Sequence, residues 1–316
     1  METRTQNALP VLQRLWIYQG ERIPLAKTSV LLAIFSAASI NVSALLAGRD
    51  LPGWPAYLAA FLVSLVIFIQ LRACDEYKDG PDDQRYRPER PIPRGLVSLK
   101  LVLGIGFALV PFAVLVTLVY HTPLLILLVL VWLWMGLMTV EFFVPVWLKA
   151  RPILYMVSHM AIMPLLDLFV TGAEWLPAQA GPAPALVLFL ILSFANGCVL
   201  EIGRKIWSPG NERDGVETYS SAWGLPCAIM VWIAMTGLSF LLLLGVGFST
   251  GHLLATGLPG LVMLAIVWWT AFSMRSTPNG KLQARLETMS GLWVFVCYAA
   301  AGFAPLLGDV LGKVLT

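Results

Sequence analysis

Long apolar runs separated by short polar segments dominate this chain. Nine of the runs are long enough to cross a bilayer as helices. They cover residues 25–47, 54–73, 97–119, 122–143, 152–172, 183–203, 221–245, 251–274 and 288–311. Because backbone amides in lipid must be paired within their own segment, the pattern predicts an all-α integral membrane protein. We expect nine transmembrane helices in a bundle, forming a single domain over residues 1–316.

The lysines and arginines predict an orientation for this bundle. An odd number of spans places the two ends of the chain on opposite sides of the membrane. With a cytoplasmic N-terminus, every one of the 21 lysines and arginines except Arg49 and Lys313 falls on the cytoplasmic side, as the positive-inside rule requires. The C-terminus is then expected on the opposite side, and a bacterial inner membrane is the compartment we expect.

Composition excludes a soluble globular protein. The chain is 58% hydrophobic and 12% charged, with a mean hydropathy of +0.79. The first residues include Glu2 and lack an early apolar core, so we expect no cleavable signal peptide. Residues 9–18, LPVLQRLWIY, are expected to lie as an amphipathic helix at the membrane interface. The expected partners are membrane lipid and small molecules, with no nucleic acid, and the oligomeric state stays open.

Charge is concentrated in one polar segment after the second run. Residues 74–95 read CDEYKDGPDDQRYRPERPIPRG, with acids first and arginines after. The candidate metal ligands are Asp75, Glu76, Asp79 and Asp83. Clustered carboxylates repel each other unless a cation compensates, and oxygen ligands without His or Cys suit Mg²⁺. A solvated cytoplasmic loop would account for the arginines but not for the acids.

Acid followed by base is the composition of a cradle for a metal diphosphate. Arginines such as Arg87 and Arg90 supply forked donors for phosphate oxygens that a metal leaves uncovered. Asp75 and Asp79 are four residues apart, which puts them on neighbouring rows of a helix. Gly80-Pro81 is expected to end this helix, so that Asp83 returns from a loop.

A second polar segment, residues 196–224, follows the sixth run. Glu201, Arg204 and Lys205 close the run, and Glu212 lies in the loop after it. An acid at this depth needs a metal or a basic partner, and Lys205 on the same helix is the alternative partner. Thr218 or Ser220 is expected to cap the seventh span. The two motifs, at about 72–95 and 196–224, lie four helices apart. We therefore expect them at the same cytoplasmic mouth, in pseudo-repeated halves.

Three further polar residues fall inside predicted spans. Asp167 lies well within the fifth span, and His159 precedes it by eight residues on about the same helix face. Ionisable groups at this depth are costly and tend to be functional. Together with Asn196, they are candidates for an acceptor pocket. Interhelical hydrogen bonds with a purely structural role are the alternative.

With these residues in place, the chain resembles the UbiA-type intramembrane prenyltransferases. The first signature of that family reads (N/D)DxxDxxxD, followed by an Arg-Pro element and a glycine. Here Asp75, Glu76, Asp79 and Asp83 have that spacing, and residues 87–95, RPERPIPRG, match the tail. Glu76 replaces a usual aspartate. Nine helices and a two-part cytoplasmic site also fit, so the resemblance covers essentially the whole chain.

The second motif departs from the family pattern. The family has an Asp and then a DxxxD pair beginning seven residues later, and the matching positions are Glu201, Ser208 and Glu212. Ser208 thus stands where a metal-binding Asp is usual. The resemblance implies that Glu201 and Glu212 bind metal. The diphosphate contacts that we expect are Arg22, Arg87, Arg90, Lys149, Arg204 and Lys205.

The resemblance implies a Mg²⁺-dependent prenyltransferase that ionises a prenyl diphosphate. The allylic cation would be captured by an aromatic or otherwise electron-rich acceptor. A membrane terpene cyclase of the same fold, which quenches the cation without an acceptor, is the main alternative. A CDP-alcohol phosphotransferase is disfavoured because no acid follows Gly95 in "LVSLKLVLG". A transporter is disfavoured because the charge gathers at one mouth instead of at midplane depth.

Overall fold

Helices form every regular element of the part of the chain that the structure, a computed structural model, describes, namely residues 9–307. In chain order they are α2 (Val11–Arg22), α3 (Leu25–Ala47), α4 (Trp54–Lys78), α5 (Gly80–Tyr86), α6 (Leu99–Ala108), α7 (Val110–Tyr120), α8 (Leu124–Thr139), η1 (Glu141–Phe143), α9 (Pro145–Lys149), α10 (Pro152–Met160), α11 (Ile162–Trp175), α12 (Leu186–Arg204), η2 (Pro209–Asn211), α13 (Tyr219–Trp223), α14 (Leu225–Ser249), α15 (Leu253–Ser276) and α16 (Gly280–Gly302). The prediction of an all-α fold is therefore confirmed.

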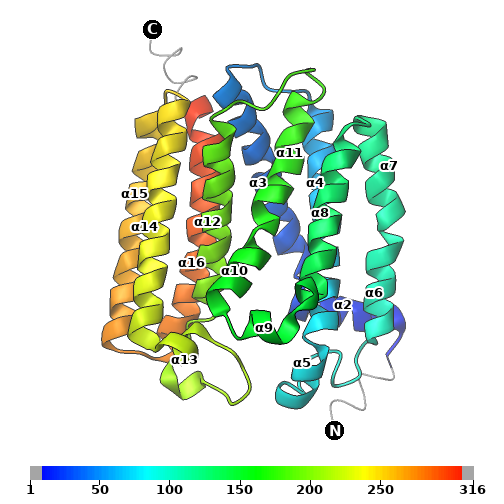
Figure 1. Cartoon of the computed structure of the whole chain (residues 1–316), viewed down its shortest axis with the longest axis vertical. Helices are drawn as coiled ribbons and strands as arrows, with labels where there is room; N and C mark the ends of the chain where they lie inside the picture. Colours follow the sequence, from blue (N-terminus) through cyan, green and yellow to red (C-terminus); the bar gives the residue numbers. More distant parts are fainter. Residues whose placement is uncertain (1–8, 308–316) are drawn as a thin grey trace.

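The long helices stand side by side in one bundle, as Figure 1 shows. α11 lies at its centre and packs against α3, α4, α8 and α12. α14, α15 and α16 form one side, and α16 packs against α3, which joins the two halves of the chain. The short helices α5, α9 and α13 all lie at the lower end in Figure 1, where α2 crosses beside the bundle.

Seven helices in residues 9–307 are long and apolar enough to cross a membrane. They match seven of the nine predicted spans, and the protein is a multi-pass integral membrane protein. The other two predicted spans correspond to α8, with 16 residues, and to α16, whose first turns carry Lys281, Arg285 and Glu287. The predicted end of the last span, residues 308–311, lies outside the described residues. Nine spans therefore stay a prediction.

Proline interrupts two of the predicted spans. The span at 97–119 is divided into α6 and α7, and the one at 152–172 into α10 and α11. Pro164 has no N–H to pair with the carbonyl of Met160, where α10 ends. In the same way, Pro111 has no N–H to pair with the carbonyl of Phe107. These breaks separate His159 on α10 from Asp167 on α11.

Two local predictions were wrong. Gly80-Pro81 does not lead into a loop, because both residues begin the short helix α5, which carries Asp83. Proline is tolerated in the first turn of a helix, where its missing N–H has no partner to lose. Thr218 is a helix cap as predicted, but for α13, where it forms a capping box with Ser221. α14 begins only after Gly224.

A close approach between α16 and α3 gives a test of the bundle packing. A Cβ built on Gly302 would lie 2.5 Å from the Cα and the carbonyl oxygen of Ala38, which are backbone atoms that cannot rotate away. Gly302→Ala should therefore lower stability by about 1–3 kcal/mol, measured as a lower apparent Tm in detergent. Gly291→Ala on the same helix meets nothing within 4 Å and is the matched control. Equal Tm values for the two variants would contradict this packing.

Candidate active site

The first motif lies at the carboxyl end of α4. Asp75 and Glu76 are in the last turns of this helix, and Asp79 is its C-cap residue. Carboxylates are unfavourable here, because the partial charge at the end of a helix is also negative. Each of these acids therefore needs a positive partner, and the structure separates those that have one from those that do not.

Glu76 is buried and held between basic side chains. It is 2% exposed, and it accepts a hydrogen bond of 2.6 Å from Arg22 Nε of α2. Arg72 Nε lies 3.5 Å from the same oxygen, Oε1, and the hydroxyl of Tyr18 donates to it at 3.4 Å. Burial, followed by the charge of Glu76, raises the pKa of Tyr18, so this hydroxyl stays protonated. The acid predicted as a metal ligand and the arginine predicted as a diphosphate contact are therefore paired with each other.

Asp83 on α5 has a similar environment. It is 3% exposed, accepts a hydrogen bond from Arg90 Nη1 at 2.7 Å, and lies 3.7 Å from Arg87. Burial, and after it the neighbouring charge of Arg90, lower the pKa of Arg87. A guanidinium keeps its proton even so. One carboxylate shared by two arginines leaves a surplus of positive charge, which suits an anionic ligand.

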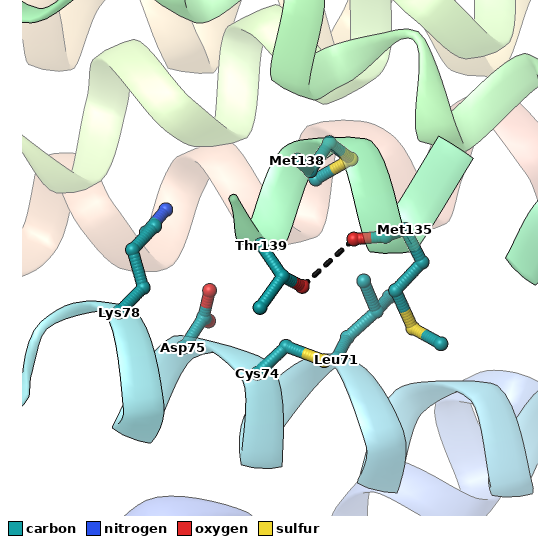
Figure 2. Close-up of a pocket in the computed structure, with 7 residues that line it drawn as sticks. All are labelled: Leu71, Cys74, Asp75, Lys78, Met135, Met138 and Thr139. Atoms are coloured by element: carbon teal, nitrogen blue, oxygen red, sulfur yellow. Dashed lines mark hydrogen bonds between the residues drawn. The ribbon is translucent and has the colours of Figure 1, made fainter. Parts of the chain in front are cut away.

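Asp75 and Asp79 remain the most available acids of the motif. The side chain of Asp75 is 40% exposed, and its basic neighbour Arg72 lies at 3.4 Å. Asp79 has no hydrogen bond or ion pair through its side chain within residues 9–307. Asp75 and Lys78 reach from α4 toward α8 at a small cavity (Figure 2), whose walls also include Leu71, Met135 and Met138.

The second motif faces this end of α4 from α12. Glu201 is 4% exposed, and it pairs with Arg204 at 2.5 Å and Lys205 at 2.9 Å. Here the basic residues are favoured by the helix terminus. The guanidinium of Arg204 also lies within electrostatic range of Asp75 and Asp79. The two motifs therefore meet at one end of the bundle, with acids on the α4 side and a positive surplus on the α12 side.

The loop after α12 holds the two remaining motif positions. The backbone N–H of Ser208 donates to Gln283 Oε1 of α16 at 2.9 Å, and its hydroxyl donates to the same oxygen at 3.2 Å. Glu212 accepts hydrogen bonds from Thr218 at 2.8 Å and Ser220 at 2.6 Å. In this structure both side chains brace the loop, and Ser208 contributes no carboxylate.

Tyr155 of α10 occupies the space between the motifs and was not predicted from the sequence. Lys78 Nζ donates to its hydroxyl at 2.8 Å, and Lys205 Nζ lies 5.8 Å from the centre of its ring. The carboxylates of Asp79 and Glu201, one from each motif, are within its electrostatic range. The only signal in the sequence was its position four residues before His159, on the same helical face.

Lys149 of α9 links the first motif to the turn after α8. Its Nζ lies 3.7 Å from Asp82 and 3.7 Å from Glu141. Glu141 is 4% exposed, and no donor in residues 9–307 gives either of its oxygens a hydrogen bond. Burial is the main cause that raises the pKa of Glu141, and Lys149 opposes it. Lys149 is therefore at the rim of the site, as a diphosphate contact would need to be.

The three predicted pocket residues lie in different surroundings. Asp167 is fully buried and accepts hydrogen bonds from Ser39 at 2.7 Å and Tyr298 at 2.6 Å, so it ties α11 to α3 and α16. Asn196 is also fully buried and accepts from Ser239 of α14 at 2.7 Å. Of the three, His159 is the one that contacts Tyr155, with the two rings stacked at 4.0 Å.

The acids at this end of the bundle can hold a magnesium ion if phosphate oxygens of a substrate complete its coordination shell. Mg²⁺ takes one or two carboxylates and completes its shell with water and phosphate oxygens, and Asp75 with Asp79 can supply that number. In the described part of the chain, no three His, Cys, Asp or Glu side chains gather closely enough to hold a metal by themselves. Glu76, Asp83 and Glu201 already have basic partners.

This chain belongs to the UbiA prenyltransferase family, whose profile matches residues 32–295. It is therefore a prenyltransferase, and members of this family generally use a divalent metal. A curated relative, digeranylgeranylglyceryl phosphate synthase of Thermococcus sibiricus, is 23% identical over 270 residues, which are 81% of this chain and 87% of the relative.

Two solved structures have the same fold. One is a UbiA homolog from Aeropyrum pernix K1, with a TM-score of 0.64, 14% identity, and coverage of 88% of this chain and 98% of the other. The second comes from work on digeranylgeranylglyceryl phosphate synthase in membranes, with a TM-score of 0.61, 14% identity, and coverage of 92% and 97%.

Substituting single acids of the first motif should distinguish, by their effect on the apparent Tm, carboxylates that are paired with a base from those that are not. Asp83→Asn leaves Arg87 and Arg90 without their shared partner and should cost about 2–3 kcal/mol, below the usual cost of breaking a buried pair because Arg90 is partly exposed. Asp79→Asn, the matched change, removes a carboxylate from a helix end that disfavours it and should leave the apparent Tm unchanged or higher. A comparable loss of Tm in both variants would contradict the assignment.

Proposed function

We propose that this prenyltransferase ionises a prenyl diphosphate in a Mg²⁺-dependent step at the end of the bundle where the two motifs meet. The prenyl group is then transferred to a small-molecule acceptor. When bound, Mg²⁺ supplies Lewis-acid neutralisation of the diphosphate oxygens. The observation that supports this proposal is the arrangement of available acids on α4 opposite a positive surplus on α12.

The residues of the two motifs take different parts in this proposal. Asp75 and Asp79 are the metal ligands, because their oxygens are the least engaged by basic side chains. Arg204 and Lys205 bind the diphosphate from the opposite side, with Arg87 and Lys149 at the rim. Asp83 holds Arg87 in position, and Glu201 holds Arg204 and Lys205, while Glu76 is paired with Arg22 and Arg72. The metal-ligand roles first expected of these three and of Glu212 thereby become positioning roles.

The apolar tail of the substrate is proposed to enter among the helices behind the small cavity at α4 and α8. Leu71, Met135 and Met138 line that cavity next to Asp75 and Lys78, so a polar head and an apolar chain each meet matching side chains. We propose geranylgeranyl diphosphate as the donor, on the name of the curated relative. The same name favours the hydroxyl of a glyceryl phosphate as the acceptor, while an aromatic acceptor stays the alternative.

We further propose that this end of the bundle faces the cytoplasm, since the basic residues gather there. A bacterial inner membrane stays a prediction. A membrane terpene cyclase is not favoured, because the family and the curated relative are both prenyltransferases.

The test is release of inorganic diphosphate from geranylgeranyl diphosphate by the purified protein, with Mg²⁺ or with EDTA. Geranylgeranylglyceryl phosphate or 4-hydroxybenzoate is added as acceptor, and products are identified by mass spectrometry. Asp79→Asn should reduce Mg²⁺-dependent release by at least about 100-fold, since transition-state charge stabilisation of this kind contributes that much or more. Asp214→Asn, an exposed acid of the loop after α12, should match the wild type.

Each result has a distinct meaning. Release that survives EDTA, or an Asp79→Asn variant as active as the wild type, would refute the proposed metal site. Release without any prenylated acceptor but with a cyclic hydrocarbon product would establish the cyclase instead. Prenylated product from one acceptor alone would identify the acceptor class.

A further inference from the structure

His159 has a buried ring nitrogen to which the proposed reaction assigns no role. The residue is 5% exposed, and its Nδ1 lies 2.8 Å from the backbone carbonyl of Tyr155 and 3.3 Å from the hydroxyl of Ser158. Its other ring nitrogen, Nε2, is buried and has no hydrogen-bond partner in residues 9–307. Buried polar atoms without a partner are rare in folded proteins, so each requires an explanation.

The hydrogen bond at Nδ1 defines which nitrogen carries the proton. A carbonyl oxygen can only accept, so Nδ1 must donate to Tyr155. The Ser158 hydroxyl gives its own proton to the same carbonyl at 3.0 Å, which leaves its oxygen as a second acceptor for Nδ1–H. The ring is therefore the Nδ1–H tautomer, and Nε2 bears a free lone pair.

A second proton on Nε2 would be a buried charged donor with no acceptor, which is costly. The ring is therefore neutral in this structure, and the lone pair of Nε2 is available to a hydroxyl donor. Its ring is stacked on Tyr155. The charged groups that face it are Lys78 from α4 and Glu201 and Lys205 from α12. His159 thus lies at the junction of both motifs.

The turn beside His159 is strained in a way that supports this position. Glu141, Phe142 and Phe143 all have left-handed backbone conformations, with φ of 47°, 53° and 62°. Each costs roughly 1–2 kcal/mol in a residue other than glycine, and such strain clusters at functional sites. The turn places the Phe142 ring 5.4 Å from Trp134 and 6.2 Å from His159. An aromatic wall therefore closes one side of the base.

We propose that His159 Nε2 is the general base that takes the proton from a hydroxyl-bearing acceptor. This inference rests on the proposed function. The bond between C1 of the prenyl chain and the diphosphate oxygen breaks, and its electron pair leaves with the diphosphate. The acceptor oxygen forms a new bond to C1, and its proton passes to Nε2, giving an ether, inorganic diphosphate and a protonated imidazole that later loses the proton to water.

The test compares His159→Asn with the wild type, using geranylgeranyl diphosphate and geranylgeranylglyceryl phosphate. Asparagine can keep the hydrogen bond from the Nδ1 position to Tyr155 while removing the base. Ether formation should fall by about 100-fold or more, as for loss of a general base. The affinity for geranylgeranyl diphosphate and the apparent Tm should stay unchanged. In the wild type, kcat/KM should fall at acidic pH as this base becomes protonated. His159→Asn should lack this pH dependence.

Two controls separate chemistry from structure. His121→Asn makes the same change between α7 and α8, at the opposite end of the bundle in Figure 1, and should behave as the wild type. His159→Gln loses the hydrogen bond to Tyr155 as well as the base. If this variant alone has a lower Tm while both variants lose ether formation equally, the missing base is the cause.

Several outcomes would overturn the inference. Ether formation at the wild-type rate in His159→Asn would do so, as would a joint loss of Tm and diphosphate affinity in that variant. If the wild type prenylates a ring carbon of 4-hydroxybenzoate but not the hydroxyl of the glyceryl phosphate, the hydroxyl-acceptor role is wrong while the proposed prenyl transfer stands. The proposed function itself fails if Mg²⁺-dependent diphosphate release is absent or survives Asp79→Asn, or if the product is a cyclic hydrocarbon.

Discussion

The pairing of three buried acids with basic side chains is the interaction on which this site depends. Glu76 lies between Arg22 and Arg72, Asp83 between Arg87 and Arg90, and Glu201 between Arg204 and Lys205. Charges taken from water are tolerable only when paired, and breaking such a pair is expensive. Asp83 and Glu201 each have two bases, which leaves those two clusters positive, whereas Arg72 beside Glu76 also lies 3.4 Å from Asp75. This positive charge favours binding of an anionic substrate even without a metal ion.

Because these clusters are positive, the two acids left on α4 are the groups that can bind a cation. Asp75 and Asp79 sit at a negative helix end, yet the nearby bases are mostly engaged elsewhere. Such acids raise the free energy of the empty protein and lower that of a state with a bound cation. The fold maintains this arrangement through short elements at one end of the bundle, α5, α9 and α13 (Figure 1). The long helices supply the scaffold, and their ends supply the chemistry.

The sequence predicted the parts of this protein that depend on local pattern. Apolar runs predicted the helices, and the spacing of Asp75, Asp79 and Glu201 predicted two motifs that indeed lie at one end of the bundle. It could not predict which acids are neutralised, because Arg22 and Glu76 are 54 residues apart and pair only through tertiary packing. The same holds for Asp167, whose partners Ser39 and Tyr298 are 128 and 131 residues away. Tyr155 could not be predicted, because one tyrosine in an apolar helix forms no sequence pattern of its own.

The departures from the family motif also follow from this distribution of charge. Ser208 stands at a usual aspartate position, and it donates its hydrogen bonds to Gln283, which ties the loop to α16 without adding negative charge. Arg204 and Lys205 on the adjoining helix end then outweigh Glu201. The second motif has thereby become a cationic half and the first an anionic half with a cationic rim. In the proposed reaction, Asp75 and Asp79 would hold the cation of a metal diphosphate, and Arg204 and Lys205 would bind its phosphate oxygens.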